Sequence, residues 1–270
     1  MGELDGKVAI VTGAGRLRGI GRGAAVAFAK LGADVVVTGT GRDPSAFPPD
    51  EKAVGWRDIE SSAEQVRALG ARALTLVTDV ASIDGVQAMV DRTLEEFGRI
   101  DILVNNAASA RGPDRVPLLD LDPDVFQKVV DVKVRGTFLT SKAVAKVMID
   151  QGEGGKIVNV SSGAGKTGGV HALAYNAACF AQVGMTQSLA KELGPHRINV
   201  NCVCPGAVDT SRVDDLGRGD AWQEIERSIP IGRAGTDEEV GAIIAYLCTE
   251  ATSWITGQSI NVDGGGMMEH

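Results

Sequence analysis

Short apolar runs alternate along this chain with longer stretches that have helical spacing, and this alternation constrains the fold more than any other feature. The runs expected to form strands lie at residues 7–12, 34–38, 72–78, 101–104, 156–160, 197–203 and 258–262. Most of them are continuously apolar, which is typical of strands buried on both faces, whereas half-exposed strands alternate apolar with polar residues. The pattern predicts an α/β fold in which helices cover both faces of one parallel sheet of about seven strands.

Helices are expected between these strands. They are placed at residues 21–31, 58–69, 82–97, 123–149, 173–193 and 237–248, with Ser82 and Thr236 as caps. Two connections, residues 39–57 and 204–220, are too long for simple turns, and each follows the carboxyl end of a strand. Ligands bind at that edge of an open parallel sheet, so these loops are candidate walls of a site. The alternative is that they are tolerated surface insertions.

Length and charge limit the function classes. A chain of 270 residues suits one domain over residues 1–270, and its net charge of −8 argues against nucleic acid or an anionic membrane as the main partner. A small molecule is therefore the expected ligand. Residues 1–6 lack the features of a signal peptide and no apolar run reaches the roughly eighteen residues of a membrane span, so we expect a cytoplasmic protein.

The chain has four cysteines, and they are too few and too scattered for a disulfide framework or a metal site. They are Cys179, Cys202, Cys204 and Cys248. Cys202 and Cys204 lie two apart on an expected strand and thus on the same face of it. No metal is expected.

A glycine-rich loop follows the first expected strand and precedes a helix. It contains Gly13, Gly15, Gly19, Ile20 and Gly21. A pyrophosphate must approach backbone N–H groups at a helix N-terminus, and glycines remove the Cβ atoms that would block it. The loop in this position predicts dinucleotide binding, with a mere tight turn as the alternative.

The residues near the end of the second strand bear on the choice of dinucleotide. An acidic residue there would bind the adenosine ribose and repel a 2′-phosphate, but residues 38–42 contain no carboxylate. Arg16, Arg18 and Arg42 could instead bind the phosphate, since the guanidinium fork matches its oxygens. These residues favour NADP(H) over NAD(H), unless each arginine is only a solvated surface residue.

Together these motifs resemble the short-chain dehydrogenase/reductase family over almost the whole chain. Five residues lie between Gly13 and Gly19 where the family has three, which leaves open which glycine turns the loop. The resemblance implies a single Rossmann-type, doubly wound domain that binds a nicotinamide cofactor. The further cofactor-binding residues that it implies are Asp79, Val80, Asn106, Ala107, Ala108, Tyr175, Pro205, Gly206, Val208 and Thr210.

Ser162 lies thirteen residues before Tyr175, which is the family's spacing between its substrate-binding serine and its proton-donating tyrosine. Hydride addition to a carbonyl carbon places negative charge on the oxygen, so one hydroxyl must donate a proton while another orients that oxygen. Tyr175 is expected to donate and Ser162 to orient. The alternative is a turn serine and a core aromatic.

The expected catalytic group departs from the family at two positions. Cys179 stands four residues after Tyr175, where the family has a lysine, and Lys133 stands where it has an asparagine. We hypothesise that Lys133 supplies the positive charge that Cys179 cannot. The plain alternative is that Lys133 points to solvent and Cys179 is a small apolar filler. A nucleophilic thiol is disfavoured because no histidine lies at helical spacing to activate it.

The sequence thus predicts an NADP(H)-dependent oxidoreductase that reduces a carbonyl or imine, or oxidises a secondary alcohol. The alternative from another class is a cofactor-binding protein with little or no redox turnover, and a hydroxyl-dependent elimination is disfavoured by the intact glycine loop. A homo-oligomer, tetramer or dimer, is implied by the family, and the apolar residues Phe126, Val130, Val134 and Phe138 allow one helix to face a partner. Substrate identity depends on residues 109–117 and 204–220.

Overall fold

The structure, a computed structural model, describes residues 2–268, and its centre is one parallel sheet of seven strands in the order β3-β2-β1-β4-β5-β6-β7. The strands are β1 Val8–Val11, β2 Asp34–Gly39, β3 Ala73–Val77, β4 Ile102–Asn105, β5 Gly155–Val160, β6 Ile198–Pro205 and β7 Ser259–Val262. Each predicted strand is confirmed within a few residues. The doubly wound α/β prediction is therefore correct.

Burial explains why the central strands read as unbroken apolar runs. Every residue of β1 and β4 is buried, whereas the edge strands β3 and β7 are half-buried. In β1, Ala9 and Val11 belong to the core on one face of the sheet, and Val8 and Ile10 belong to the core on the other. Because successive side chains of a strand point to opposite faces of the sheet, β1 contributes residues to both cores.

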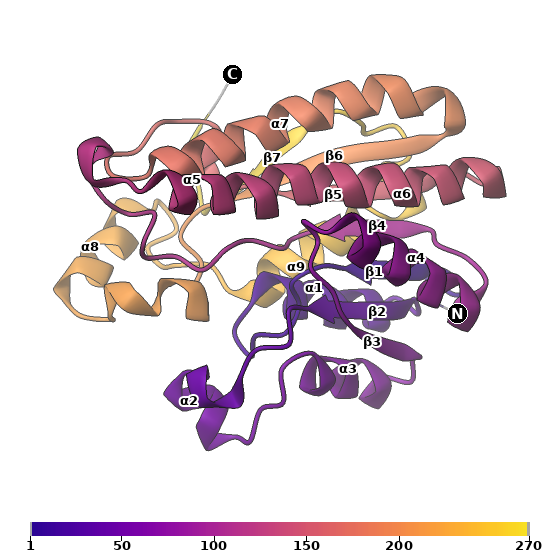
Figure 1. Ribbon diagram of the computed structural model, residues 1–270, viewed down its shortest axis with the longest axis horizontal. Helices are drawn as coiled ribbons and strands as arrows, with labels where there is room; N and C mark the ends of the chain where they lie inside the picture. The colour runs from indigo at the N-terminus through magenta and orange to yellow at the C-terminus, as the bar shows by residue number, and fades with distance from the viewer. Residues whose placement is uncertain (1, 269–270) are drawn as a thin grey trace.

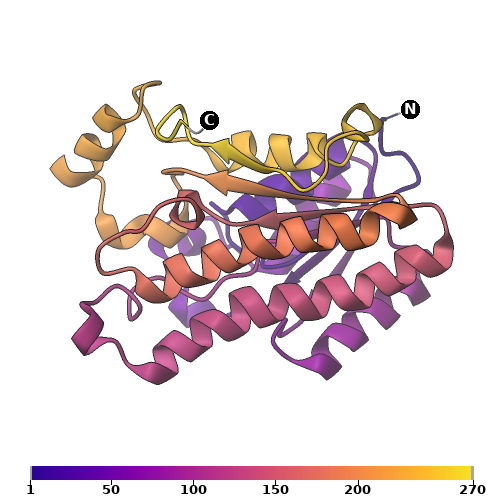
Figure 2. The ribbon, with the colours of Figure 1, turned by 90° about the horizontal axis from the view of Figure 1, so that it is seen from above.

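Helices cover both faces of the sheet (Figures 1 and 2). One face is covered by α1 Ile20–Lys30, α3 Ile59–Ala68 and α9 Asp237–Tyr246, and the other by α4 Ile83–Phe97, α6 Gly136–Gln151 and α7 Leu173–Leu193. The predicted caps are confirmed: the Ser82 hydroxyl accepts from the Gly85 N–H, and Thr236 forms a capping box with Glu239.

The structure corrects two expectations about helices. The predicted helix 123–149 consists of α5 Pro123–Val130 and α6, joined by a π-turn over Asp131–Arg135. The helix α8, Asp220–Ser228, was not predicted, because its charged sequence buries only one side chain, that of Trp222. Short helical pieces also lie in the long loop after β2, including α2 Pro49–Ala53.

The carboxyl ends of the strands gather the predicted functional segments at one edge of the sheet. Strand order reverses direction at β1, which pairs with β2 on one side and β4 on the other, and such a switch point forms the ligand crevice of doubly wound sheets. Both long loops lie at this end, as the positions of α2 and α8 show (Figure 1). Within the described chain, none of the helices combines the length and apolarity needed to cross a bilayer.

Candidate active site

The glycine loop is turned by Gly13 and packed tight by Gly21. Gly13 has φ +68°, a conformation that favours glycine, and a Cβ on Gly21 would lie 2.6 Å from Asn106 Nδ2. That amide nitrogen donates to the carbonyl oxygens of Thr12 and Gly13, both at 2.9 Å. The loop is thereby fixed to the turn after β4, and the question of which glycine turns it is answered.

The first turn of α1 leaves donors for an anion. Gly19 is the N-cap residue, no side chain among the described residues caps the helix, and its first turn has no acidic residue. The N–H groups of the first helical residues lack intrahelical acceptors, and they carry the positive end of the helix dipole. The Gly19 N–H itself donates to Asp237 Oδ2 at 3.1 Å. This helix terminus fits the pyrophosphate of a dinucleotide.

Part of the glycine loop is covered by the chain's own side chains. The Leu17 N–H donates to Glu51 Oε1 at 3.0 Å, and Trp56 Nε1 donates to the Gly15 carbonyl at 2.6 Å. A Cβ on Gly15 would lie only 2.0 Å from Asp58 Oδ1. Residues 51–58 therefore cover this part of the loop, whereas the first turn of α1 keeps its donors.

Arg42 is bound by two carboxylates. Its Nε donates to Asp58 Oδ1 at 2.9 Å and its Nη1 to the fully buried Glu51 at 2.8 Å. Burial alone would lower the pKa of Arg42, but these hydrogen bonds raise it above its usual value. Asp58 also accepts from the Arg42 N–H at 3.1 Å, so a carboxylate does lie beside the end of β2. The sequence analysis missed it because it comes from beyond the loop.

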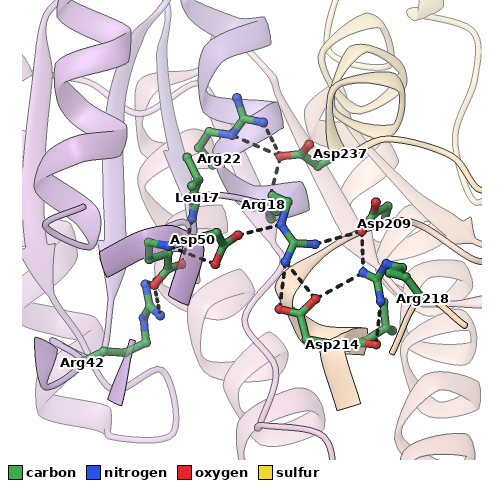
Figure 3. A network of polar contacts seen from close by, with 12 residues as sticks. Leu17, Arg18, Arg22, Arg42, Asp50, Asp209, Asp214, Arg218 and Asp237 are labelled. Atoms are coloured by element: carbon green, nitrogen blue, oxygen red, sulfur yellow. Dashed lines mark hydrogen bonds and ion pairs between the residues drawn. The ribbon is translucent and has the colours of Figure 1, made fainter. Parts of the chain in front are cut away.

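Arg18 joins the two long loops (Figure 3). It donates to Asp50 from the loop after β2, and to Asp209 and Asp214 from the loop after β6, each at 2.8 Å. Burial alone would lower the pKa of Arg18, but the hydrogen bonds to Asp214 and Asp50 raise it. The positive charges of Arg18 and Arg42, on which the NADP(H) preference partly depended, are thus already neutralised.

Arg16 differs from these two arginines. Its side chain makes no hydrogen bond or ion pair with any of residues 2–268, and it is half-buried. Burial lowers the pKa of Arg16 below its usual value, and the nearby Arg42 adds to this effect. A half-buried guanidinium without a partner fits an anionic ligand such as a phosphate.

The remaining segments assigned to the cofactor surround the same crevice. Thr12 Oγ1 accepts from the Asn106 and Ala107 N–H groups at 3.0 and 3.1 Å, while Ala108 is exposed. Val80 is buried against Gly136, where a Cβ would lie 2.7 Å from Val80 Cγ2. These contacts hold the turns after β3 and β4 beside the glycine loop. Asp79 is exposed, and its Oδ1 accepts from the N–H of Ala81, two residues on.

The segment after β6 is fixed on both sides. A Cβ on Gly206 would lie 2.6 Å from Asp263 Cβ, so the chain after Pro205 packs directly on the turn after β7. Val208 pairs with Gly235 in a short bridge. Thr210 is buried and precedes the 3₁₀ turn Ser211–Leu216. This segment begins the second long loop.

Ser162 and Tyr175 come from adjacent turns. Ser162 follows β5, and its hydroxyl accepts from the Ala164 N–H at 3.2 Å. Tyr175 lies in the first turn of α7, and the neighbouring Asn176 Nδ2 donates to the carbonyl oxygens of Ala164 and Thr167 at 2.9 and 2.8 Å. Asn176 thus ties the start of α7 to the serine turn. Both predicted residues are half-buried.

Lys133 points into the protein. It is 3% exposed, its Nζ donates to the Val160 carbonyl at 2.8 Å, and that nitrogen lies 5.7 Å from the centroid of the Tyr175 ring. The alternative that Lys133 points to solvent is therefore wrong. The π-turn that carries it inserts a residue into a long helix, a feature common at functional sites.

Cys179 is buried in the packing between α7 and the turn after β5. Its side chain is fully buried, its carbonyl accepts from Ser161 Oγ at 3.0 Å, and a Cβ on Gly165 would lie 2.9 Å from that carbonyl oxygen. Cys202 and Cys204 do share one face of β6, with sulfurs 4.0 Å apart.

Sequence reasoning missed two arginines that stack on Tyr175. Arg115 Cζ lies 4.3 Å and Arg212 Cζ 5.0 Å from the centroid of the phenol ring. They come from residues 109–117 and 204–220, the two segments expected to decide the substrate. Their membership of those segments was the only signal, because a loop has no periodicity from which a side-chain position could be predicted.

A hollow of about 740 Å³ lies at the opposite edge of the sheet, lined by side chains that include Lys7, Asp101, Glu153 and Arg197. It is at the amino ends of the strands, where ligands do not bind in doubly wound folds, and it holds none of the predicted residues. The site is therefore assigned to the carboxyl edge. The described residues contain no group of three or more histidine, cysteine or acidic side chains that could hold a metal ion.

Comparison with known proteins gives matches over the whole domain. A family profile described as Enoyl-(Acyl carrier protein) reductase matches residues 13–266. The chain is 37% identical over 265 residues to 2-dehydro-3-deoxy-D-gluconate 5-dehydrogenase of Escherichia coli (strain K12), covering 97% of this chain and 96% of that protein.

Solved structures give matches of the same extent. A short-chain type dehydrogenase/reductase from Mycobacterium marinum is 35% identical with a TM-score of 0.84, covering 98% of this chain and 97% of that one. Carveol dehydrogenase from Mycobacterium avium, in complex with NAD, is 29% identical with a TM-score of 0.88 and full coverage of both chains.

Proposed function

Because the chain belongs to the short-chain dehydrogenase/reductase family and is an enzyme of that family, we propose that it transfers a hydride between a nicotinamide cofactor and a carbonyl or imine, or the corresponding secondary alcohol or amine. The observation that carries the proposal is the juxtaposition of Tyr175, on the first turn of α7, with the Ser162 turn and the buried Lys133 Nζ. Cofactor and substrate would meet at the carboxyl edge of the sheet.

The cofactor in this proposal is NADP(H). The first turn of α1 would hold its pyrophosphate, and Arg16 would hold the 2′-phosphate, since it is the arginine of the three that has no partner within the described residues. Asp58 lies on the same side of the loop and acts against this preference, because a carboxylate there repels a phosphate. The balance between Arg16 and Asp58 sets the ratio of KM values for NADPH and NADH.

The bound cofactor supplies a hydride from C4 of its nicotinamide ring. Tyr175 donates its hydroxyl proton to the substrate oxygen in reduction and accepts it in oxidation, and Ser162 donates a hydrogen bond that orients the same oxygen. Lys133 provides a buried positive charge 5.7 Å from the centroid of the phenol ring, where it would stabilise negative charge that develops during the reaction. It takes the electrostatic role that Cys179 cannot perform.

The proposal is tested by Tyr175→Phe, with Tyr246→Phe as the matched control. These are the two tyrosines of the chain, and Tyr246 is half-exposed on the far helix α9. Loss of the proton donor should lower kcat for carbonyl reduction by about 10²-fold or more, measured by NADPH oxidation across a carbonyl panel at pH 6 to 9. The control should keep full activity.

Cofactor binding is measured in parallel by NADPH fluorescence. Both tyrosine variants should still bind NADPH. Binding without turnover in the natural protein would contradict the proposal and support a cofactor-binding protein without redox activity.

We also propose that the enzyme is a homo-oligomer, a tetramer or dimer, assembled through α6 and α7. These helices run side by side on the outside of the molecule (Figure 2), and Phe138 and Phe180 on them are 50% and 45% exposed. Phe126 and Val134 of the predicted stripe pack instead against the core cluster of Val129, Ala174 and Ala178. Light scattering during size-exclusion chromatography tests the assembly, and a monomer would overturn it.

A further inference from the structure

Three arginines from two separate loops meet at Tyr175. Arg115 and Arg212 stack on the phenol ring, with Cζ atoms 4.3 and 5.0 Å from its centroid. Burial lowers the pKa of Arg111, and the charges of Arg115 and Arg212 lower it further, so Arg111 lies within the field of both. With Lys133, three cations therefore lie against the phenol ring, and Arg111 is a fourth cation close to them.

The acidic side chains nearby do not neutralise this charge. Arg111 pairs with Asp215, and Arg115 Nε lies 3.4 Å from Asp114 Oδ2 without the alignment of a hydrogen bond. For Arg212, no ion pair occurs with any carboxylate of residues 2–268. Two carboxylates therefore face four cations.

Two of the guanidinium groups also have donors without acceptors. Arg212 Nη1 donates to the Ser109 carbonyl, but its Nη2 is buried and has no hydrogen-bond acceptor among the described residues. Arg115 Nε, although it forms an ion pair with Asp114, also has no hydrogen-bond acceptor there. A buried donor without an acceptor is destabilising, and crowded like charges add to the penalty. An anion placed between the two groups would remove both penalties, since the guanidinium fork matches a carboxylate or phosphate.

Stacking on an aromatic ring does not explain the cluster by itself. One cation over the ring face would satisfy the interaction of a cation with the π electrons, whereas here cations approach from two loops and from the π-turn. The contrast with Arg18 and Arg42 is informative, because the same protein supplies carboxylates where it needs to hold an arginine in place.

We propose that the substrate is an anionic carbonyl compound, whose carboxylate or phosphate binds Arg115 and Arg212 while its carbonyl oxygen meets the Tyr175 hydroxyl. The inference rests on the proposed redox function and specifies its substrate class. Because both guanidinium groups lie at the phenol ring itself, the anionic group lies within a few bonds of the reducible carbon. Neutral ketones of the same skeleton would leave the buried donors of the two arginines without acceptors and would bind more weakly.

Matched substrates test the proposal: acetoacetate with methyl acetoacetate, levulinate with methyl levulinate, and dihydroxyacetone phosphate with dihydroxyacetone. With saturating NADPH, kcat/KM for at least one charged member should exceed that of its neutral partner by about tenfold or more. Preference within the first two pairs identifies a carboxylate, and preference within the third identifies a phosphate. Equal kcat/KM values for charged and neutral members in all three pairs would overturn the inference while leaving the proposed function intact.

Variants assign the preference to the arginine. Arg212→Leu should raise KM for the preferred anion by about tenfold or more and lower kcat/KM for the anion more than for its neutral partner, while Arg212→Lys should recover part of the preference. Arg92→Leu is the control, since Arg92 is an exposed arginine on α4 that pairs with Glu95. An equal loss for charged and neutral members in Arg212→Leu would contradict a role in binding the anion.

A binding measurement separates the two proposals. Malonate, which cannot be reduced at its carboxylates here, should stabilise the NADPH-loaded protein in a thermal-shift assay, whereas dimethyl malonate should not, and Arg212→Leu should abolish the difference. Anion-selective binding without any turnover would contradict the proposed function and support the anion site. If malonate and its ester act alike and no charged substrate is preferred, the anion site is refuted.

Discussion

Arginines at the carboxyl edge of the sheet fall into two groups that differ in their partners. Beside the glycine loop, Arg18 binds three carboxylates and Arg42 binds two. Beside Tyr175, Arg212 binds one backbone carbonyl and keeps a buried donor without an acceptor in the described structure. The difference separates charges that hold loops in place from charges that are available to a ligand.

Sequence alone cannot make this separation. The sequence shows only that three arginines lie near the loop, so each could equally bind a phosphate: Arg16, Arg18 and Arg42. Their partners show that Arg16 belongs with Arg212, among the arginines without a carboxylate partner in residues 2–268. Variants can distinguish the two groups, because loss of a carboxylate-bound arginine should affect stability, whereas loss of an arginine from the other group should affect binding or rate.

The largest expected effect is on stability. Arg42→Leu leaves the fully buried Glu51 and the nearby Asp58 without their counter-charge, so the free energy of unfolding should fall by about 3–5 kcal/mol. Arg212→Leu, which breaks no ion pair of the described residues, should change it by less than about 1 kcal/mol. Urea unfolding at pH 7 measures both. Equal losses of unfolding free energy in the two variants would show that a carboxylate partner does not mark the arginines that stabilise the fold.

The next largest effect concerns Lys133. A unit charge 5.7 Å from the centroid of the phenol ring, at an effective dielectric of 20, is worth at most about 3 kcal/mol of interaction with negative charge that develops there. Lys133→Asn should therefore lower kcat for alcohol oxidation at pH 8 by up to about 100-fold. Ketone reduction should change less, because the protonated phenol still donates.

Restoring the family's arrangement provides the control for Lys133. The double variant Lys133→Asn with Cys179→Lys should recover oxidation, since a lysine then again lies one helical turn after Tyr175. A harmless Lys133→Asn together with a strongly activating Cys179→Lys would contradict the idea that the charge has moved from one position to the other.

A smaller effect is expected at the adenosine end of the site. Arg16→Ala should weaken NADPH binding by about tenfold, at the lower end for a charged hydrogen bond because the side chain is only half-buried, and it should leave NADH binding unchanged. Fluorescence titration measures both, with Arg57→Ala as the control because Arg57 is exposed and pairs with Glu64. Equal losses for the two cofactors would place Arg16 away from the 2′-phosphate.

Most of the fold could be predicted from the sequence because burial leaves a periodic signal. Fully buried strands such as β1 and β4 read as unbroken apolar runs, and the capping residues Ser82 and Thr236 mark helix starts. By contrast, α8 is charged and buries only Trp222, so it gives no apolar stripe. The π-turn that carries Lys133 keeps helical spacing on both sides and therefore looks like continuous helix.

The candidate site divides in the same way. Residues attached to strand ends, such as Gly13, Asn106 and Ser162, could be placed from the sequence because a strand fixes where its carboxyl end points. Arg115 and Arg212 could not, since the loops that carry them are positioned by contacts such as that of Arg212 with the Ser109 carbonyl. Asp58 was missed for the same reason: a loop brings it back to Gly15 from far along the chain.

The smallest expected effect concerns Asp101 and its partner Arg99, a paired arginine at the opposite edge of the sheet. Asp101 accepts from Arg99 Nε at 2.8 Å and from the Val8 N–H at 2.9 Å. Burial alone would raise the pKa of Asp101, but these hydrogen bonds and the charge of Lys7 lower it below its usual value. Its stabilising contribution is therefore present above the unfolded pKa of about 4, and it is lost as pH falls through the lower folded value.

Asp101→Asn should therefore lower the free energy of unfolding by about 1 kcal/mol at pH 7. This difference from the natural protein should begin to narrow as pH falls below about 4 and should close only below the folded pKa, where the carboxyl group is neutral in both states. Urea unfolding at pH 7, 5, 3.5 and about 2.5 measures the difference. A difference that stays constant over this whole range would mean that the shape of the side chain matters and its charge does not. Arg212→Leu should show no such closing difference, because no carboxylate of the described residues depends on its charge.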